Sequence, residues 1–284
     1  MIPKIIHYCW FGRGPMPASA YKCIDSWKKF LSNYEIKLWN EDNFDINTIP
    51  YTREAYAAKK YAFVSDFARF WILHKYGGLY FDTDVEVIRP LDDIIERGPF
   101  MGCEKDGLTS LRGDHTSCRV APGLGLGVNP GLGLGVNPGL GLYKEIIDLY
   151  SSLHFDISYR NGLPPKTVVD YTTMVLSRHG LKPTNDIQFC AGIWIYPKEY
   201  FAPKDVDTHL LEITDNTRTI HHYDASWAEW YDKASGTRGI KLRKMFGRRV
   251  GNFINVIIYV LQKDGLSGLA KKSIHKIAKS LGLS

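Results

Sequence analysis

Two aspartates, Asp82 and Asp84, end an apolar run, and their type and spacing suit a divalent cation. In an extended backbone, residues two apart share one face, so both carboxylates leave the chain on the same side. Two oxygen ligands do not enclose a cation, which leaves open positions for the phosphate oxygens of a substrate. Such a pair is weak evidence alone, because exposed turns often contain one. Leu79, Tyr80 and Phe81 strengthen it, since charges at the end of a buried strand are costly without a partner.

A second charged pair, Asp66 and Arg69, precedes this strand. Their spacing of three residues puts both side chains on one face of a helix. One interpretation is an ion pair on a solvated surface. The neighbouring Phe67, Phe70 and Trp71, however, leave little of this helix free to face water. We therefore expect the pair to point toward the aspartates.

The stretch from Phe63 to Val87 must position these four side chains. Its first half repeats apolar residues at helical spacing, Gly77 and Gly78 end the helix, and from Leu79 the pattern alternates as in a strand. The preceding chain reads as strand (2–11), helix (18–31), strand (34–39) and short helix (52–60). This rhythm predicts an α/β sheet.

Composition bounds the cellular setting. The 284 residues carry a net charge of +6, but 238–284 holds eleven Lys or Arg and one Asp, so its charge is +10 and that of 1–237 is −4. The five cysteines show no C-x-x-C spacing, which indicates reduced thiols and no zinc site. We recognise no signal peptide, and no apolar stretch approaches the ~20 residues of a membrane span. We therefore expect a cytoplasmic protein.

A glycine-rich octapeptide, PGLGLGVN, occupies 122–129, recurs at 130–137 and begins again at 138–142. Solenoid repeats need about 20 residues or more, so this is not a repeat architecture. We expect 122–142 to be an expanded loop. A lid over a bound substrate is the alternative, and a phosphate cradle is less favoured because no Lys-Ser/Thr follows the glycines.

The pattern Ser65-Asp66-x-x-Arg69, then Gly77-Gly78-x-Tyr80-x-Asp82-x-Asp84, resembles the core of glycosyltransferases that carry the DXD motif. The similarity is to family 32, with its yeast initiating mannosyltransferases and bacterial capsule or lipooligosaccharide transferases, and more distantly to the large clostridial glucosylating toxins. The opening run IPKIIHYCWFG matches too. The resemblance implies an α/β fold of GT-A type, a Rossmann-like mixed sheet flanked by helices, over residues 1–237.

The resemblance also implies roles. Asp66 and Arg69 would hold hydroxyls of a donor sugar, with Tyr80 packed near it. Asp82 and Asp84 would reach Mn²⁺ or Mg²⁺, directly or through water, so that Asp66, Arg69, Asp82 and Asp84 form the catalytic set. Trp10, at a strand end beside glycines, would stack on the nucleotide base, although a core position explains it as well.

Residues 220–230, IHHYDASWAEW, are similar to the terminal motif of metal-dependent GT-A enzymes. There an imidazole completes the metal shell, and a serine and a tryptophan, here Ser226 and Trp227, lie over the phosphates. Adjacent residues of a strand face opposite ways, so one histidine alone can serve. The following Tyr223 matches the family pattern and favours His222. His221 is the alternative, and a structural role for either stays open.

Residues 238–284 read as a basic amphipathic helical tail. Its apolar face is formed by Leu266, Leu269, Ala270, Ile274, Ile277 and Leu281, and its polar face by Lys271, Lys272, Lys276 and Lys279. Such a helix suits an anionic membrane surface. A partner subunit is the alternative, and nucleic acid is disfavoured because the rest of the chain is acidic and shows no recognition module.

The sequence therefore predicts a metal-dependent glycosyltransferase. It would move a hexose from a UDP- or GDP-sugar to a glycan or lipid-linked acceptor, with retention, in the biosynthesis of cell-surface polysaccharide such as capsule, at the inner face of the membrane. Two other classes stay open: a catalytically silent protein that binds sugar nucleotides or glycans, and a membrane-associated scaffold. Nucleotide, sugar, acceptor, linkage and oligomeric state are not distinguished.

Overall fold

The computed structural model describes residues 2–105, 119–128, 138–156, 166–204, 210–224 and 230–271, some of them by backbone alone. The chain divides into two compact units. Unit 1 comprises Met1–Lys204 and Glu212–Tyr223, and unit 2 comprises Asp205–Leu211 and Asp224–Ser284. A functional boundary between 237 and 238 stays a prediction.

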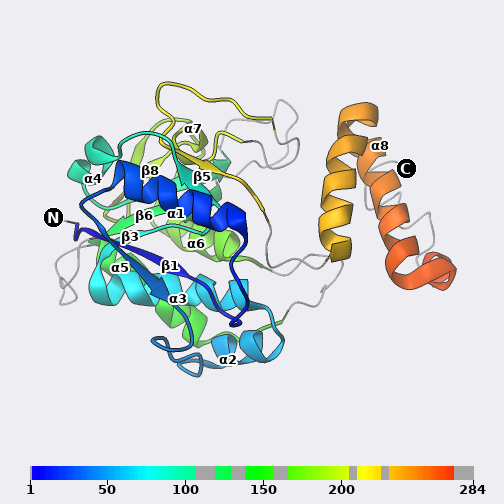
Figure 1. Cartoon of the computed structure of the whole chain (residues 1–284), viewed down its shortest axis with the longest axis horizontal. Helices are drawn as coiled ribbons and strands as arrows, with labels where there is room; N and C mark the ends of the chain where they lie inside the picture. The colour runs from blue at the N-terminus through cyan, green and yellow to red at the C-terminus, as the bar shows by residue number, and fades with distance from the viewer. Residues whose placement is uncertain are drawn as a thin grey trace. The chain divides into compact units, whose positions relative to one another are not determined.

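Unit 1 is built on a mixed sheet with helices on its faces (Figure 1), which confirms the predicted α/β class. Seven strands of the described residues form this sheet in the order β2-β1-β3-β6-β5-β8-β7. They are β1 (Ile5–Cys9), β2 (Glu35–Trp39), β3 (Gly78–Tyr80), β5 (Phe100–Lys105), β6 (Arg119–Val128), β7 (Gln188–Cys190) and β8 (Ile193–Tyr196). The helices of this unit are α1 (Ala18–Phe30), α2 (Pro50–Ala57), α3 (Tyr61–Tyr76), α4 (Asp92–Arg97), α5 (Pro138–Ser151), α6 (Val168–Arg178) and α7 (Lys198–Phe201).

Strand direction brings the chemistry-bearing residues to one edge of this sheet. Strands β1, β2 and β3 are parallel, and β6 runs antiparallel to both β3 and β5. The carboxyl ends of β1 and β3 therefore meet at the same edge, where Trp10 and Asp82 follow them. Ligands of α/β sheets bind at such carboxyl ends.

A separate two-stranded sheet continues from this edge. It pairs β4 (Val85–Val87) antiparallel with β9 (Thr219–His221). Helix α1 fastens β4, because the Trp27 indole donates to the Val85 carbonyl at 2.8 Å and the Val87 amide donates to the Ser26 hydroxyl at 2.9 Å. The chain after Asp84 is thereby fixed to the core.

The glycine repeat corrects one expectation. A loop over 122–142 is wrong for its first copy, because β6 runs through Val128 and lies inside the sheet between β3 and β5. Glycine alternates there with Leu or Val, which is the two-residue period of a strand. The third copy opens α5 at Pro138, and residues 129–137 lie outside the described part of the chain.

The turn between α3 and β3 contains no spare residue. Gly77 ends α3 at φ 65° and Gly78 begins β3 at φ 95°. The ring Nε2 of buried His7 donates to the Gly77 carbonyl at 2.9 Å, and the Trp39 indole donates to His7 Nδ1 at 3.0 Å. Burial lowers the pKa of His7 to about 4, so the ring stays neutral and keeps both bonds. The distance from the helix to the aspartates is set by this turn.

Unit 2 contains α8 (Trp230–Lys271), whose helical course is interrupted at Gly247 and Gly265. None of the helices in the described ranges has the length and apolar character needed to cross a bilayer.

Substitution of Gly78 by alanine should destabilise unit 1 strongly. The added Cβ would lie 2.6 Å from the Ile5 carbonyl oxygen, at a φ that side chains avoid, so we expect a loss of about 3 kcal/mol in the free energy of unfolding. Gly98→Ala is the matched control, because its φ is 119° but no atom lies within 4 Å. It should cost roughly 1 kcal/mol. Equal losses in urea unfolding would contradict the steric role of Gly78.

Candidate active site

Arg69 joins helix α3 to the end of β3. Its Nη2 donates to Asp66 Oδ1 at 3.1 Å, its Nη1 to Asp82 Oδ2 at 3.2 Å and its Nε to the Ser65 carbonyl at 3.0 Å. The guanidinium carbon lies 4.9 Å from the centre of the Tyr80 ring, and the residue is 4% exposed. The Asp66–Arg69 pair therefore faces Asp82, as the helical spacing predicts.

Two carboxylates compete for this one buried cation. Burial raises the pKa of Asp66 to about 7; Arg69 opposes the increase and Asp82 adds to it. A carboxylic acid can donate as well as accept, whereas a carboxylate can only accept. Near neutral pH, Asp66 can therefore serve either polarity of a ligand hydroxyl.

Asp82 is held from two sides. The Tyr80 hydroxyl donates to its Oδ1 at 3.2 Å, while Arg69 donates to its Oδ2. Burial raises the pKa of Tyr80 well above its ordinary value, so the phenol keeps the proton that it donates. Both oxygens of Asp82 thus have partners inside the protein.

Asp84 faces a histidine of β9. The His221 Nε2 lies 3.2 Å from Asp84 Oδ1, and the His222 ring pairs with Glu86 Oε2 at 2.8 Å. The register of β4 with β9 places His221 opposite Val85, next to Asp84, and the following residue must face the other side. Among the two histidines the alternative, rather than the favoured His222, therefore lies beside the aspartates. Metal ligation by either stays a prediction.

The surroundings of His221 favour a cation. Burial opposes the charged form of this imidazole, but the facing Asp84, with Asp82 and Glu104, outweighs it and raises the pKa of His221. Its other ring nitrogen, Nδ1, is buried and has no hydrogen-bond partner among the described residues. Positive charge is thus stabilised at this point of the site.

The donor set fits an open metal site and not a closed one. Among the described residues, no three His, Cys, Asp or Glu side chains converge as a complete metal cage. Asp84 and His221 provide one oxygen and one nitrogen close together. Such a pair can hold Mn²⁺ or Mg²⁺ only if other oxygens, from a substrate or from water, complete the shell.

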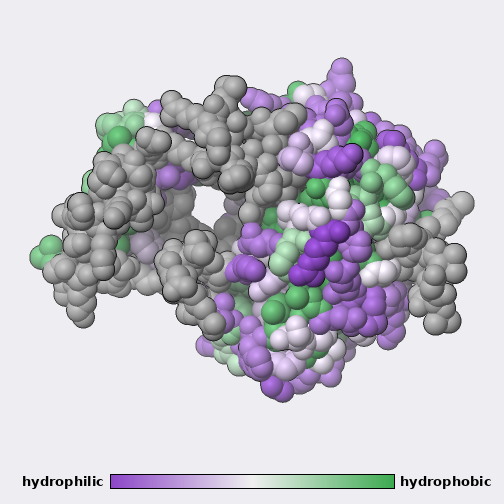
Figure 2. All heavy atoms as spheres, turned by 180° about the vertical axis from the view of Figure 1, so that it is seen from behind, coloured by the Kyte–Doolittle hydropathy of each residue, from purple (hydrophilic) through white to green (hydrophobic). Residues whose placement is uncertain are grey.

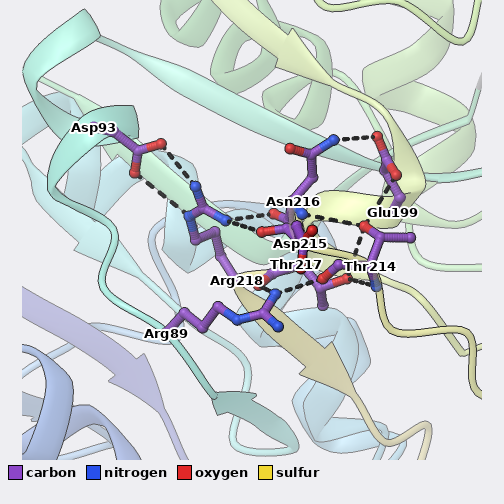
Figure 3. A network of polar contacts seen from close by, with 8 residues as sticks. All are labelled: Arg89, Asp93, Glu199, Thr214, Asp215, Asn216, Thr217 and Arg218. Carbon is purple, nitrogen blue, oxygen red and sulfur yellow. Dashed lines mark hydrogen bonds and ion pairs between the residues drawn. The ribbon is translucent and has the colours of Figure 1, made fainter.

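A polar network fastens the loop before β9 (Figure 3). Arg89 donates to the carbonyls of Thr214 and Thr217, and Arg218 donates to the carbonyls of Asp215 and Asn216 and to both carboxylate oxygens of Asp93. Glu199 accepts from Thr214 and Asn216. The loop is therefore tied to α4 and α7, which fixes the strand that presents His221. Sequence reasoning missed this network, because its members are far apart in the chain.

The loop after β1 carries Trp10, which is half-buried and donates its indole N–H to the Gly14 carbonyl at 2.7 Å. The neighbouring Gly12 amide donates to Glu41 Oε1 at 2.6 Å, and the Tyr56 hydroxyl donates to the same oxygen at 2.9 Å. Glu41 therefore shapes the loop that presents Trp10. The sequence indicated only a polar turn there.

Two predicted donor contacts, Ser226 and Trp227, lie outside the described residues. A residue that sequence reasoning missed is Cys9, whose buried thiol interacts with Arg69, Tyr80 and Asp82. Burial raises the pKa of this thiol to about 12, so it stays protonated beneath the charged groups. Its position as the last residue of β1, at the carboxyl edge of the sheet, was the available signal.

Residues 17–101 match the family described as the glycosyltransferase sugar-binding region containing the DXD motif, which confirms the resemblance. An uncharacterized glycosyltransferase of Acanthamoeba polyphaga mimivirus is 34% identical over 111 residues, which are 37% of this chain and 44% of that protein. Inositol phosphoceramide mannosyltransferase 3 of Schizosaccharomyces pombe is 33% identical over 102 residues, which are 33% of this chain and 27% of that protein. Both matches thus span less than half of either protein.

Two solved structures are similar in part. The PaToxG glycosyltransferase has a TM-score of 0.39 and 18% identity, covering 62% of this chain and 69% of that one. A glycosyltransferase involved in glycosylation of the major capsid of PBCV-1 has a TM-score of 0.42 and 14% identity, covering 84% of this chain and all of that one. Both scores are below 0.5 and do not establish a common fold.

The burial of Asp66 predicts a pH dependence of stability. Its pKa is about 7 in the folded protein and about 3.9 in an unfolded chain, so the folded state binds the proton more tightly. Between these values, rising pH should lower the free energy of unfolding, by at most about 1.4 kcal/mol per pH unit.

Asp66→Asn removes this titration. Urea unfolding of both proteins between pH 4 and pH 8 isolates the residue, because other titrating groups are common to both. The wild type should lose stability relative to the variant as pH rises. A constant or opposite difference would show that Asp66 is not held in its protonated form.

Proposed function

We propose that this chain, whose residues 17–101 match the sugar-binding region of glycosyltransferases containing the DXD motif, moves a hexose from a UDP- or GDP-sugar to a glycan or lipid-linked acceptor. The observation that carries the proposal is the Asp66–Arg69–Asp82 linkage, with Asp84 and His221 following it. A group for sugar hydroxyls and a group for a cation thus belong to one stretch of the fold.

The donor would lie across the carboxyl edge of the sheet. Trp10 would stack on its base, Asp66 and Arg69 would bind hydroxyls of the sugar, and Tyr80 would support Arg69 through its ring face. Asp66 near its pKa can accept from one hydroxyl and donate to another. Ser226 and Trp227 keep their proposed place over the phosphates from the family resemblance alone.

A divalent cation, Mn²⁺ or Mg²⁺, would be held by Asp84 with His221, and Asp82 would act through water because its two oxygens already have partners. When bound, the ion would neutralise the charge that develops on the departing diphosphate. The predicted set of Asp82, Asp84 and His222 is thereby revised in our proposal to favour His221.

The chain's own side chains would position the reacting sugar. Arg69 and Asp66 fix the ring by its hydroxyls, so that positive charge can develop at the anomeric carbon as the bond to the diphosphate breaks. We assign no covalent nucleophile. Retention, by attack of the acceptor from the face that the diphosphate leaves, follows the family resemblance.

The tail suggests where the reaction takes place. Residues 238–284 carry a charge of +10, and cationic segments are attracted to the anionic cytoplasmic leaflet. We propose a cytoplasmic enzyme attached peripherally to the inner face of the membrane, acting in the biosynthesis of cell-surface polysaccharide such as capsule.

Slow hydrolysis of a donor tests the enzyme assignment. The purified chain is incubated with a panel of UDP- and GDP-sugars and Mn²⁺, and released nucleotide is measured. We expect release from one donor, loss with chelator, and a fall of about 100-fold in Asp84→Asn. Binding of a donor without turnover would support the silent binding protein. Neither binding nor turnover would support the scaffold.

The two histidines give a matched pair of variants. His221→Ala should lower the metal-dependent rate about 10- to 100-fold, since it removes the imidazole beside Asp84. His222→Ala should change it little, since this ring pairs with Glu86. Rates are compared across a Mn²⁺ titration. The reverse order would restore His222 as the ligand.

A further inference from the structure

Helix α8 of unit 2 is a hairpin of two arms. Gly247 has φ 75° and ψ 168° inside the helix, which reverses the chain between the arms 230–246 and 248–264. A second break at Gly265, with φ 66°, ends the second arm. Figure 1 shows the arms side by side.

Direct contacts hold the arms together. Arg238 donates to Asn255 and to Gln262, each at 2.9 Å, and Arg243 donates to Asn252 at 3.2 Å. At Gly251 an added Cβ would lie 2.6 Å from the Arg243 amide nitrogen, so the two backbones touch there. The end of the hairpin at Gly247 is therefore held in place by its own packing.

Apolar side chains are exposed at that end, which we call the hairpin tip and define as residues 244–250. Met245 is 72% exposed, Phe246 49% and Val250 43%. Figure 2 shows hydrophobic surface, in green, on this helical unit. Neighbouring apolar residues that face water mark an interaction site more often than scattered single ones do.

The charges around the tip identify the partner. Residues 241–249 contain five Lys or Arg and no Asp or Glu, and the side chains of Lys241 and Lys244 are exposed. Apolar side chains with surrounding cations match the interface of an anionic bilayer, where acyl chains lie directly beneath phosphate. The buried centre of a protein interface is instead depleted of charge.

We propose that the hairpin tip is the membrane anchor of this protein. It inserts Met245 and Phe246 into the boundary between headgroups and acyl chains of an anionic bilayer, and Lys241 and Lys244 bind lipid phosphates. The inference rests on the membrane association proposed above and is independent of sugar transfer. It assigns anchoring to the tip rather than to the terminal segment 266–281.

A fluorescent probe at the tip tests the insertion. The full chain carries an environment-sensitive dye on Met245→Cys in a Cys118→Ser background, because the other cysteines, Cys9, Cys23, Cys103 and Cys190, are buried. With vesicles of phosphatidylcholine and phosphatidylglycerol, its emission should shift to the blue and brighten. The control site is Leu266→Cys, which is 80% exposed in the same unit but lies beyond Gly265. An equal response at 266, or none at 245, would overturn the proposal.

Co-sedimentation with the same vesicles measures the contribution of the tip. Met245→Ser with Phe246→Ser should weaken binding about tenfold or more, and Leu266→Ser by less than about twofold. Circular dichroism checks that the helices remain. The tip is refuted if the double variant binds normally while neutralising Lys271, Lys272, Lys276 and Lys279 abolishes binding, although membrane association then stands.

Two further readouts decide against other partners. Loss of self-association in the double variant, with vesicle binding intact, would make the tip a contact between copies and overturn the lipid assignment. Donor hydrolysis in detergent-free buffer should be unchanged by the double variant, so failure of the anchor is distinguishable from failure of the proposed enzyme.

Discussion

The buried guanidinium of Arg69 is the constraint on which the site depends. A cation at 4% exposure is tolerated only with charged partners, and its partners come from two elements: Asp66 from its own helix and Asp82 from the end of β3. The two elements therefore cannot shift independently without leaving a buried charge unpaired. Their separation is set by the turn at Gly77, which neutral His7 holds from β1.

This linkage divides the labour of the two aspartates. Asp82 is bonded on both oxygens by Tyr80 and Arg69, so it belongs to the group that would bind sugar. Asp84 faces His221, in surroundings that favour positive charge. An Asp-x-Asp pair is symmetrical in sequence, but here its members serve different neighbours, because one lies beside the buried helix and the other beside β9.

Local parts of this arrangement were predictable from sequence. The helix, the glycine stop and the four charged side chains lie within about twenty residues, so spacing alone relates them. His221 was ranked second because its position depends on a strand pairing across more than 130 residues, which no local pattern reveals. The strand at 119–128 was hidden by its glycines, which suggested a loop although they alternate with apolar residues. The hairpin at Gly247 was missed because a lone glycine within a helical pattern does not announce a reversal.

The central claim is that the sugar-binding pair and the cation-binding pair form one site for a sugar nucleotide. Electron–nuclear double resonance of Mn²⁺, added to the protein with UDP or GDP, tests it most directly. We predict a ³¹P coupling from the diphosphate together with a ¹⁴N coupling from imidazole, with the ¹⁴N signal lost in His221→Ala and both lost in Asp84→Asn. A bound Mn²⁺ that shows ³¹P coupling unaffected by Asp84→Asn, or no Mn²⁺ binding with either nucleotide, would contradict the account.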